Sequence, residues 1–244
     1  MIRVVVWNEN IHEKEMPEVA KLHPNGIHGT IAAILGEDET FSVRTATLDD
    51  PDCGLTEEVL KETDVLFWWG HAGHQLVPDD VVERVYKHVL NGMGMVVLHS
   101  GHHSKIFKKL CGTPCDLAWH DDSRERIFTV KPSHPIAKGI PHHFEIPYEE
   151  CYSEPFSIPE PEELLFIGWY NTGEVFRSGF TFRRGNGRIF YFQPGHETAP
   201  AYYIPEVLQI IKNGAHWVAE SYRVEDYAND YWERENFKEP IEKV

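Results

Sequence analysis

The sequence contains little cysteine, with only four in 244 residues. Four cysteines in a chain of this length do not make a disulfide framework, and a reducing compartment would keep them as thiols. Cys111 and Cys115 are four positions apart and could ligate a metal, but no second cysteine pair is present to complete a structural zinc site. We therefore expect buried free thiols.

Positive charge is also scarce, with 23 Lys and Arg against 39 Asp and Glu and a formal net charge of −16. This balance argues against nucleic acid or an anionic membrane surface as a partner, because both require a basic face. No apolar stretch approaches a transmembrane length, and residues 1–7 do not resemble a secretory signal, so we expect a cytoplasmic protein. A neutral sugar ligand suits the composition, which includes seven Trp that can stack on sugar rings.

In the first half of the chain, short apolar runs alternate with helical patterns. The runs are too short for helices and end in turn residues, which is typical of buried strands. One helix opens at Pro78 and ends at Asn91-Gly92, with its valines on one face. Strands are expected at 2–7, 41–47, 64–69 and 95–98, and another helix near 30–35. This order predicts an α/β fold with a doubly wound, mainly parallel sheet, helices on both faces and right-handed crossovers.

After Leu110 the pattern changes to strand-like segments separated by Pro, Gly and Asn turns. They lie at 126–130, 144–148, 164–169, 174–182 and 188–192. Several should be antiparallel additions, while the segment at 188–192 returns to the main sheet. A final helix is expected at 203–218. We interpret residues 1–244 as one domain, with 220–244 as a C-terminal extension whose aromatic residues cover the domain or a neighbouring subunit of a homo-oligomer.

The stretch from Met93 to Lys105 is where a buried strand turns toward a helix. Side chains at such a turn are lifted to the carboxyl edge of the sheet, where open α/β proteins bind ligands. The turn resembles a nucleophile elbow, but His99 occupies the nucleophile position. Ser100 could be a nucleophile if a histidine served as its base and a carboxylate oriented that base. We favour the alternative that Ser100 caps the following helix.

Histidine is frequent, with 15 residues, and several follow predicted strand ends. In an open α/β sheet these ends converge at one crevice, where imidazoles would bind zinc or a similar divalent metal, or act as general acid and base. The candidate metal ligands, of which we expect a subset to bind, are His28, His71, His74, His99, His102 and His196. Five histidines away from the strand ends are interpreted as structural: His12, His23, His88, His142 and His143. We favour the same interpretation for His120, His134 and His216.

Carboxylates accompany these histidines. Glu9 ends the first strand, Glu150 follows another glutamate, and Glu197 follows His196. In a crevice such a group can ligate a metal, orient a histidine or act as a base. Arg177 could hold a substrate oxygen or pair with Glu174. The candidate catalytic residues are Glu9, His99, Ser100, Glu150, His196 and Glu197, and the candidate substrate-binding residues are Trp69 and Arg177.

Five motifs stand out along the chain. They are Trp-Trp-Gly-His at 68–71, Leu-His-Ser-Gly-His at 98–102, Glu-Cys-Tyr-Ser-Glu-Pro-Phe at 150–156, Gly-Glu-Val-Phe-Arg-Ser-Gly at 173–179 and Pro-Gly-His-Glu-Thr at 194–198. In this order they resemble the ThuA family of trehalose-utilisation proteins, which implies a flavodoxin-like fold similar to class I glutamine amidotransferases. In that comparison His196-Glu197 resembles the His and Glu of the amidotransferase triad, with altered spacing. His99 stands where the catalytic Cys would be, which argues against glutamine hydrolysis.

The ThuA resemblance implies a role in bacterial uptake and breakdown of trehalose and related disaccharides, often beside a sugar dehydrogenase that forms 3-keto sugars. We hypothesise that the protein acts on a disaccharide or its 3-keto derivative. A 3-keto group acidifies the adjacent C2 proton, so Glu150 or a histidine could remove it while a metal or an imidazole polarises the carbonyl oxygen. Elimination or isomerisation would follow. The alternatives are a hydrolase that uses Ser100 and a non-catalytic sugar sensor.

Overall fold

The parallel part of the sheet is built from the apolar runs of the first half. The computed structural model describes residues 1–227. Its first four strands are β1 (Ile2–Asn8), β2 (Phe41–Thr47), β3 (Val65–Trp69) and β4 (Gly94–Leu98), and β9 (Gly187–Phe192) pairs with β4 in parallel. The parallel strands follow the order β2-β1-β3-β4-β9, which is the strand order of flavodoxin-like folds. The predicted doubly wound sheet is confirmed.

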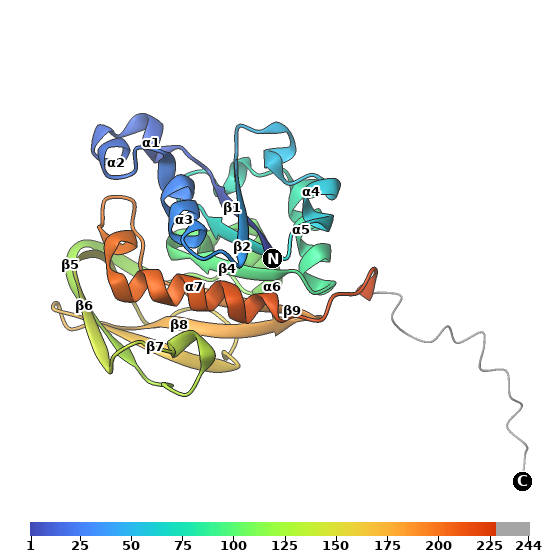
Figure 1. The fold of residues 1–244 in the computed structure, drawn as a ribbon. Coiled ribbons are helices and arrows are strands. Elements are labelled where there is room, and N and C mark those ends of the chain that lie inside the picture. Colours follow the sequence, from blue (N-terminus) through green and yellow to red (C-terminus); the bar gives the residue numbers. More distant parts are fainter. Residues whose placement is uncertain (228–244) are drawn as a thin grey trace, which may run out of the picture.

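Antiparallel strands extend the sheet beyond β9. They are β5 (Ala118–Thr129), β6 (His143–Ser153), β7 (Glu163–Tyr170) and β8 (Val175–Arg184), in the sheet order β9-β8-β7-β5-β6. Figure 1 shows them in the lower part of the view. Both the antiparallel additions and the return of β9 to the parallel part are as predicted. β5 and β6 are longer than predicted, because polar residues without an apolar alternation continue the pairing across register shifts between His120 and Glu125.

Helices cover both faces of the sheet (Figure 1). The α-helices are α1 (His12–Glu15), α2 (Pro17–Leu22), α3 (Gly26–Gly36), α4 (Glu57–Lys61), α5 (Asp79–Leu90), α6 (Lys105–Cys111) and α7 (Pro205–Ala219). Short 3-10 turns occur at η1 (Pro51–Gly54), η2 (His74–Leu76), η3 (His99–His103), η4 (Pro135–Ala137) and η5 (Ala201–Tyr203). The helices α1, α2 and α4 were not predicted from the sequence because each is too short to show a periodic apolar face.

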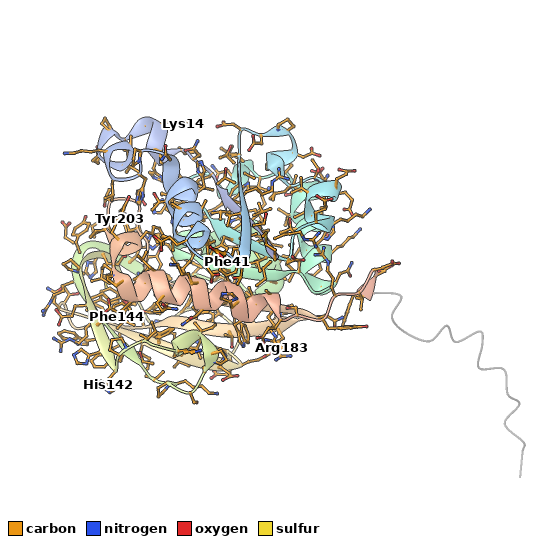
Figure 2. The ribbon with its side chains drawn as sticks, viewed as in Figure 1. Lys14, Phe41, His142, Phe144, Arg183 and Tyr203 are labelled. Carbon is orange, nitrogen blue, oxygen red and sulfur yellow. The ribbon has the colours of Figure 1, made fainter. Side chains whose placement is uncertain are left out.

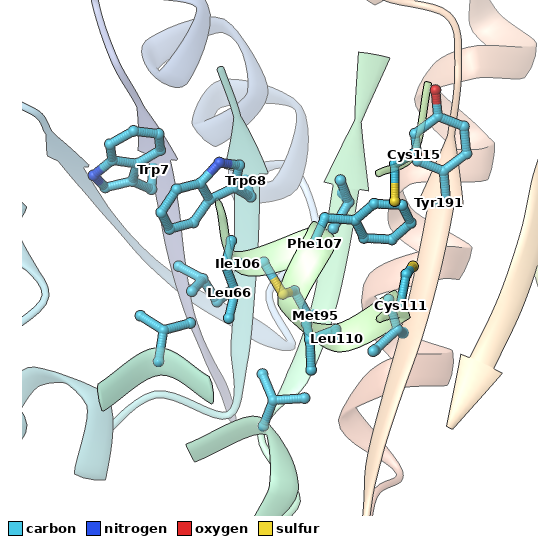
Figure 3. Close-up of a cluster of buried hydrophobic side chains, with 14 of the residues drawn as sticks. Trp7, Leu66, Trp68, Met95, Ile106, Phe107, Leu110, Cys111, Cys115 and Tyr191 are labelled. Atoms are coloured by element: carbon cyan, nitrogen blue, oxygen red, sulfur yellow. The ribbon is translucent and has the colours of Figure 1, made fainter. Parts of the chain in front are cut away.

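The alternation of side chains along the parallel strands produces two hydrophobic cores. Val5 and Trp7 point to the face covered by α5 and α6, whereas Val4 and Val6 point to the face covered by α3 and α7. Figure 3 shows the first core, in which Trp7 stacks on Trp68 with ring centroids 4.1 Å apart. Side chains also fill the opposite face, Phe41 among them (Figure 2). Because both faces are covered, β3 and β4 are apolar at every position.

The turn after β4 differs from the one that the sequence predicts. His99 has a left-handed backbone with φ of 49°, an uncommon conformation for a non-glycine residue. The turn η3 follows, and α6 begins only at Lys105 with Ser104 as its N-cap, which accepts a hydrogen bond from the Phe107 amide. The prediction that Ser100 caps the helix is wrong, because Ser100 lies inside η3 and Ser104 is the N-cap of α6. The Ser100 hydroxyl instead donates to the Gly70 carbonyl at 3.0 Å.

The remaining predictions about chain class concern thiols, the C-terminal extension and membrane spans. All four cysteines are buried free thiols, as expected. Residues 220–227 contact their own domain, where the Val224 amide donates to the Asn91 carbonyl at 2.8 Å. The predicted role of the aromatic residues Tyr231, Trp232 and Phe237 lies outside the described residues. Among residues 1–227, no helix has the length and apolar character needed to cross a membrane.

Candidate functional site

The carboxyl ends of the parallel strands lie at one level. Trp69 of β3 is in register with Asn8 of β1 and with Leu98 of β4, and Leu98 is in register with Phe192 of β9. The polar segments that follow these strands therefore meet at one edge of the sheet. This register gathers residues that lie more than a hundred positions apart in the sequence.

Four of the predicted site residues form a compact group, His71, His99, His196 and Glu197, here called the histidine cluster. One nitrogen or oxygen atom from each lies within 4.8 Å of the others. The imidazole rings of His99 and His196 have centroids 5.4 Å apart, and a Glu197 oxygen lies 3.5 Å from His196 Nε2. His99, His196 and Glu197 are buried, and His71 is partly exposed. The fold thus collects three imidazoles and one carboxylate at the predicted crevice.

His99 pairs with Glu150. Its Nδ1 lies 3.0 Å from the Gln193 carbonyl oxygen, which can only accept, so Nδ1 carries a hydrogen and Nε2 faces Glu150 and the Tyr152 hydroxyl. His99 Nε2 lies 3.0 Å from Glu150 Oε2. Burial opposes a charge on His99, but the Glu150 carboxylate outweighs it and raises the pKa of His99 to about 9. In the absence of a metal, His99 and Glu150 therefore form an imidazolium–carboxylate pair at neutral pH.

The other two imidazoles of the cluster are neutral at the same pH. Burial lowers the pKa of His196 to about 4, and it also lowers the pKa of His71. His196 Nδ1 lies 2.9 Å from the Thr198 hydroxyl, which fixes the ring with Nε2 toward Glu197. The cluster therefore combines one charged imidazole with neutral ones, which suits both proton transfer and metal ligation.

Glu9 and Glu149 hold the loops that carry the histidines. The two oxygens of Glu9 accept the amides of Ala72 and Gly73 at 2.7 and 2.8 Å. Those of Glu149 accept the amides of Gly195 and His196 at 2.9 and 3.0 Å. Gly195 adopts φ of 135°, and a side chain there would collide with the Tyr202 ring. Both glutamates are buried, so Glu9 is placed as a positioning residue, and Glu149 is a positioning residue that the sequence reading missed.

His12 also lies at the site, although the sequence analysis interpreted it as a structural histidine. Its Nε2 lies 3.6 Å from Glu197 Oε1, and its ring centroid lies 4.9 Å from that of His71. It stands in α1, just beyond the carboxyl end of β1. The signal available in the sequence was its distance of only four residues from the strand end at Asn8, the same kind of position that singled out the other histidines.

A pocket of about 550 Å³ opens beside the cluster. Its volume is in the roughly 300–1,000 Å³ range of small-molecule sites. Trp119 on β5 is 61% exposed at its wall and could stack on a sugar ring, a role that the sequence reading did not give it. The lining residues are Met16, His71, His74, Ser100, His102, His103, Trp119, Asp121, Asp122, Tyr148, Glu150, Tyr152, His196, Glu197 and Thr198.

Three candidate metal ligands lie outside the histidine cluster. His28 Nδ1 lies 3.2 Å from the side-chain nitrogen Nδ2 of Asn8, the last residue of β1. His102 is buried with Nδ1 2.8 Å from the Cys115 carbonyl oxygen. His74 lines the pocket near His103, and burial lowers its pKa to about 3. The subset that the structure brings together is therefore His71, His99 and His196.

The two candidate substrate-binding residues, Trp69 and Arg177, do not line the pocket. The Trp69 ring is fully buried and its Nε1 donates to the Gly195 carbonyl at 3.0 Å, so the ring supports the loop of His196. Arg177 binds Glu154, with Nε 2.7 Å from Oε1 and Nη2 2.9 Å from Oε2. The suggested pairing of Arg177 with Glu174 is wrong, because Glu154, just after β6, binds its guanidinium.

Ser100 lacks the surroundings of an activated nucleophile. It lies on the pocket wall, but its hydroxyl donates to the Gly70 carbonyl. A hydrolytic serine requires a histidine within hydrogen-bond reach as its base. Among the hydrogen bonds of residues 1–227, Ser100 makes none to a histidine. The arrangement supports Ser100 as a wall residue that ties η3 to the end of β3.

The histidine cluster fits a divalent metal. Three imidazole nitrogens and one carboxylate oxygen are a donor set that zinc accepts. Glu197 Oε2 is buried and has no hydrogen-bond partner among the described residues, so a cation would satisfy it. The hydrogen bond of His99 Nδ1 with a carbonyl is the usual outer contact of a metal-ligating histidine. Glu150 competes with a metal for His99 Nε2 and would have to release it.

Comparison with known proteins agrees with the resemblance in the motifs. The ThuA family model, described as trehalose utilisation, matches residues 3–218. No curated relative matches this sequence.

Solved structures share the fold. A protein of Parabacteroides merdae described as ThuA-like is 17% identical, with a TM-score of 0.70 and coverage of 90% of each chain. A Salmonella typhimurium protein described as cytoplasmic is 11% identical, with a TM-score of 0.61 and coverage of 89% of this chain and 99% of that one. A Thermoplasma acidophilum protein described as part of a GMP synthase is 14% identical, with a TM-score of 0.52 and coverage of 90% and 94%. At these identities the likeness is one of fold.

Proposed function

We propose that this chain, which belongs to the ThuA family of trehalose utilisation, processes a disaccharide or its 3-keto derivative in the pocket beside the histidine cluster. The observation that carries the proposal is the His99–Glu150 pair. Its two atoms are 3.0 Å apart, and Glu150 faces a pocket of about 550 Å³ beside two neutral imidazoles and a second carboxylate. A base held next to donors for an oxyanion is what abstraction of a proton α to a carbonyl requires.

The reaction proposed for the 3-keto sugar begins at C2. Glu150 takes the C2 proton, and the electron pair of the C–H bond forms an enolate whose negative charge lies on the C3 oxygen. The His71 and His196 imidazoles, which line the pocket, stabilise that oxygen, while the fully buried His99 holds Glu150 in place. The enolate then reforms the carbonyl, a C1–C2 double bond forms and the C1–O glycosidic bond breaks. The leaving sugar oxygen receives a proton from Glu150 or an imidazole, so the net reaction is elimination.

A divalent metal, with zinc as the first choice, belongs to this proposal. His71, His99, His196 and Glu197 would hold it. When bound, it would supply Lewis-acid polarisation of the C3 carbonyl oxygen. His99 would then be neutral at Nε2, and Glu150 would be released from its ion pair to act as the base. The residues that orient the ligands are Glu149, Gln193 and Thr198, through the contacts described above.

The proposal also includes a partner enzyme, a location in the cell and an oligomeric state. A 3-keto group has to be installed by oxidation of a sugar hydroxyl, so we propose a sugar dehydrogenase as the functional partner. We propose the cytoplasm as the location, supported by the described compartment of the similar Salmonella protein. A homo-oligomeric state stays part of the proposal.

The substrate class is tested by assaying the wild-type protein on trehalose and on its 3-keto derivative. We expect turnover of the keto sugar only, with release of free glucose. Turnover of trehalose at a comparable rate, with none on the keto sugar, would overturn the mechanism. Binding of either sugar without turnover under any metal loading would favour the non-catalytic sugar sensor.

The metal is tested by elemental analysis of untagged protein purified without added metal. We expect His71→Ala and His196→Ala each to contain about one equivalent of zinc, or of another divalent metal, fewer than the wild type. His143→Ala is the matched control, because His143 is exposed on β6 away from the pocket lining. A metal-free wild type would reject the metal and leave catalysis to His99 and Glu150.

A further inference from the structure

A second group of metal-type donors lies on the antiparallel part of the sheet. His120 on β5, Cys151 on β6 and Glu174, just before β8, each offer one donor atom, and these atoms lie within 4.8 Å of one another. His120 and Cys151 are direct cross-strand partners. We propose that His120, Cys151 and Glu174 bind a zinc ion at a second site, separate from the histidine cluster.

His120 is oriented as a metal ligand would be. Its Nδ1 lies 3.0 Å from the Asp121 carbonyl oxygen, so Nδ1 carries a hydrogen and Nε2 is the atom that faces the site. Nε2 lies 3.4 Å from Glu174 Oε1. A ligating histidine almost always donates its other N–H to a carbonyl or carboxylate, which fixes the ring. His120 is partly exposed, which leaves a path for an ion to enter.

Cys151 and Glu174 each have a side-chain donor atom for a metal whose hydrogen bonding is weak or absent. The Cys151 thiol is buried, and its contacts are a long one of 3.7 Å to the Tyr152 carbonyl and one with the Thr172 side chain. Glu174 Oε2 is buried and has no hydrogen-bond partner among the described residues. Burial raises the pKa of Cys151 to about 12, and coordination to zinc would displace the thiol proton. A cation between these groups would satisfy both.

The chemistry of the three donor groups favours zinc over calcium and magnesium. Tetrahedral zinc accepts thiolate, imidazole and carboxylate donors and can take a water in the fourth position, whereas calcium and magnesium prefer oxygen donors alone. Zinc bonds of about 2.0–2.3 Å place neighbouring donors roughly 3.3–3.8 Å apart. His120 Nε2 and Glu174 Oε1, 3.4 Å apart, already have this spacing, and the other donor distances need to close by at most about 1 Å, which the partly exposed side chains of His120 and Glu174 can supply.

The position of this site indicates that the ion would stabilise one wall of the pocket. His120 lies between Trp119 and Asp121, which line the pocket, and the pairing of β5 with β6 becomes irregular just after His120. A zinc ion would tie this irregular part of β5 to β6 and to the start of β8. It would thereby fix the pocket wall that presents Trp119, without contacting the substrate.

Cobalt(II) tests the proposal directly, because a thiolate ligand produces a near-ultraviolet charge-transfer band that imidazoles and carboxylates do not. The metal-stripped full-length chain is titrated with cobalt and then with zinc. We expect the band to appear in the wild type, to disappear when zinc is added, and to be absent in Cys151→Ser. In Glu174→Gln, the cobalt affinity should fall at least roughly tenfold.

Two comparisons separate this site from others. The Cys111→Ser/Cys115→Ser double variant should keep the band, because its loss there would place the thiolate at the other cysteine pair. His71→Ala should also keep it, since the histidine cluster contains no thiol. Circular dichroism checks that each variant is folded, and Glu174→Gln, which alters a partly exposed residue, supplies a readout if Cys151→Ser unfolds. No band in the wild type, or full cobalt affinity in Glu174→Gln, would overturn the proposal.

Discussion

The parallel and antiparallel parts of the sheet contribute to the pocket in different ways. The parallel strands place their functional residues just beyond their carboxyl ends, as with His71 after β3 and His99 after β4. The antiparallel strands use residues inside the strand, such as Trp119 on β5 and Glu150 on β6. The parallel part supplies the imidazoles and Glu197, and the antiparallel part supplies Glu150, which pairs with His99. The candidate chemistry therefore depends on the seam where the two parts meet.

The largest predicted change in stability concerns Glu125, a buried carboxyl group on β5 in the antiparallel part. Burial and the neighbouring Glu149 raise the pKa of Glu125 to about 8, above its ordinary value of 4.5. Because the folded-state pKa is raised, the stability that Glu125 contributes is complete below about pH 4.5 and is lost as the pH rises through 8.

Glu125→Gln should remove this loss, since an amide oxygen still accepts the Ser178 hydroxyl. The variant should gain up to about 4 kcal/mol over the wild type between pH 5 and 9, measured by urea unfolding. Glu160→Gln, at an exposed position, should follow the wild-type curve. A pH-independent difference between Glu125→Gln and the wild type would show that Glu125 does not hold a proton in the fold.

Glu9, just after β1 in the parallel part, and Glu149, on β6 in the antiparallel part, each accept two backbone amides of a loop. Substituting each one tests whether these hydrogen bonds stabilise both parts in the same way. Glu9→Gln and Glu149→Gln each replace one of two accepting oxygens with an amide group, which cannot accept a backbone N–H. Each variant should lose about 2 kcal/mol of unfolding free energy. If either cost stays within about 0.5 kcal/mol, as expected for a surface substitution, that glutamate does not hold its loop.

The smallest predicted effect concerns the exposed aromatic of the antiparallel part. Trp119→Ala should weaken sugar binding by about 1 kcal/mol, which raises KM about fivefold and leaves kcat nearly unchanged. Trp169→Ala on β7 is the matched control, because Trp169 does not line the pocket. A kcat that falls with an unchanged KM would show that Trp119 does not act as a stacking surface.

The sequence predicted the parallel part better than the antiparallel part, and the reason is physical. Continuous apolar runs such as 95–98 are buried on both faces, and a polar turn marks where each one ends, so His99 could be placed at the sheet edge. Glu149 shows no such signal, because nothing local distinguishes a buried glutamate inside a strand from a solvated one. Trp119 lies in an irregular polar strand, and His12 lies in a helix too short to show a period. Their roles depend on long-range pairing, which composition and periodicity do not report.

The most direct test of the account follows the C2 proton of the 3-keto derivative of trehalose by NMR in D₂O. The wild type should consume or exchange this proton, Glu150→Gln should be slower by at least about 100-fold, and Ser100→Ala should stay within a few-fold of the wild type. That result would establish Glu150, at the seam of the two sheet parts, as the base. An unchanged C2 rate in a folded Glu150→Gln variant, or loss of reaction in Ser100→Ala alone, would contradict the account.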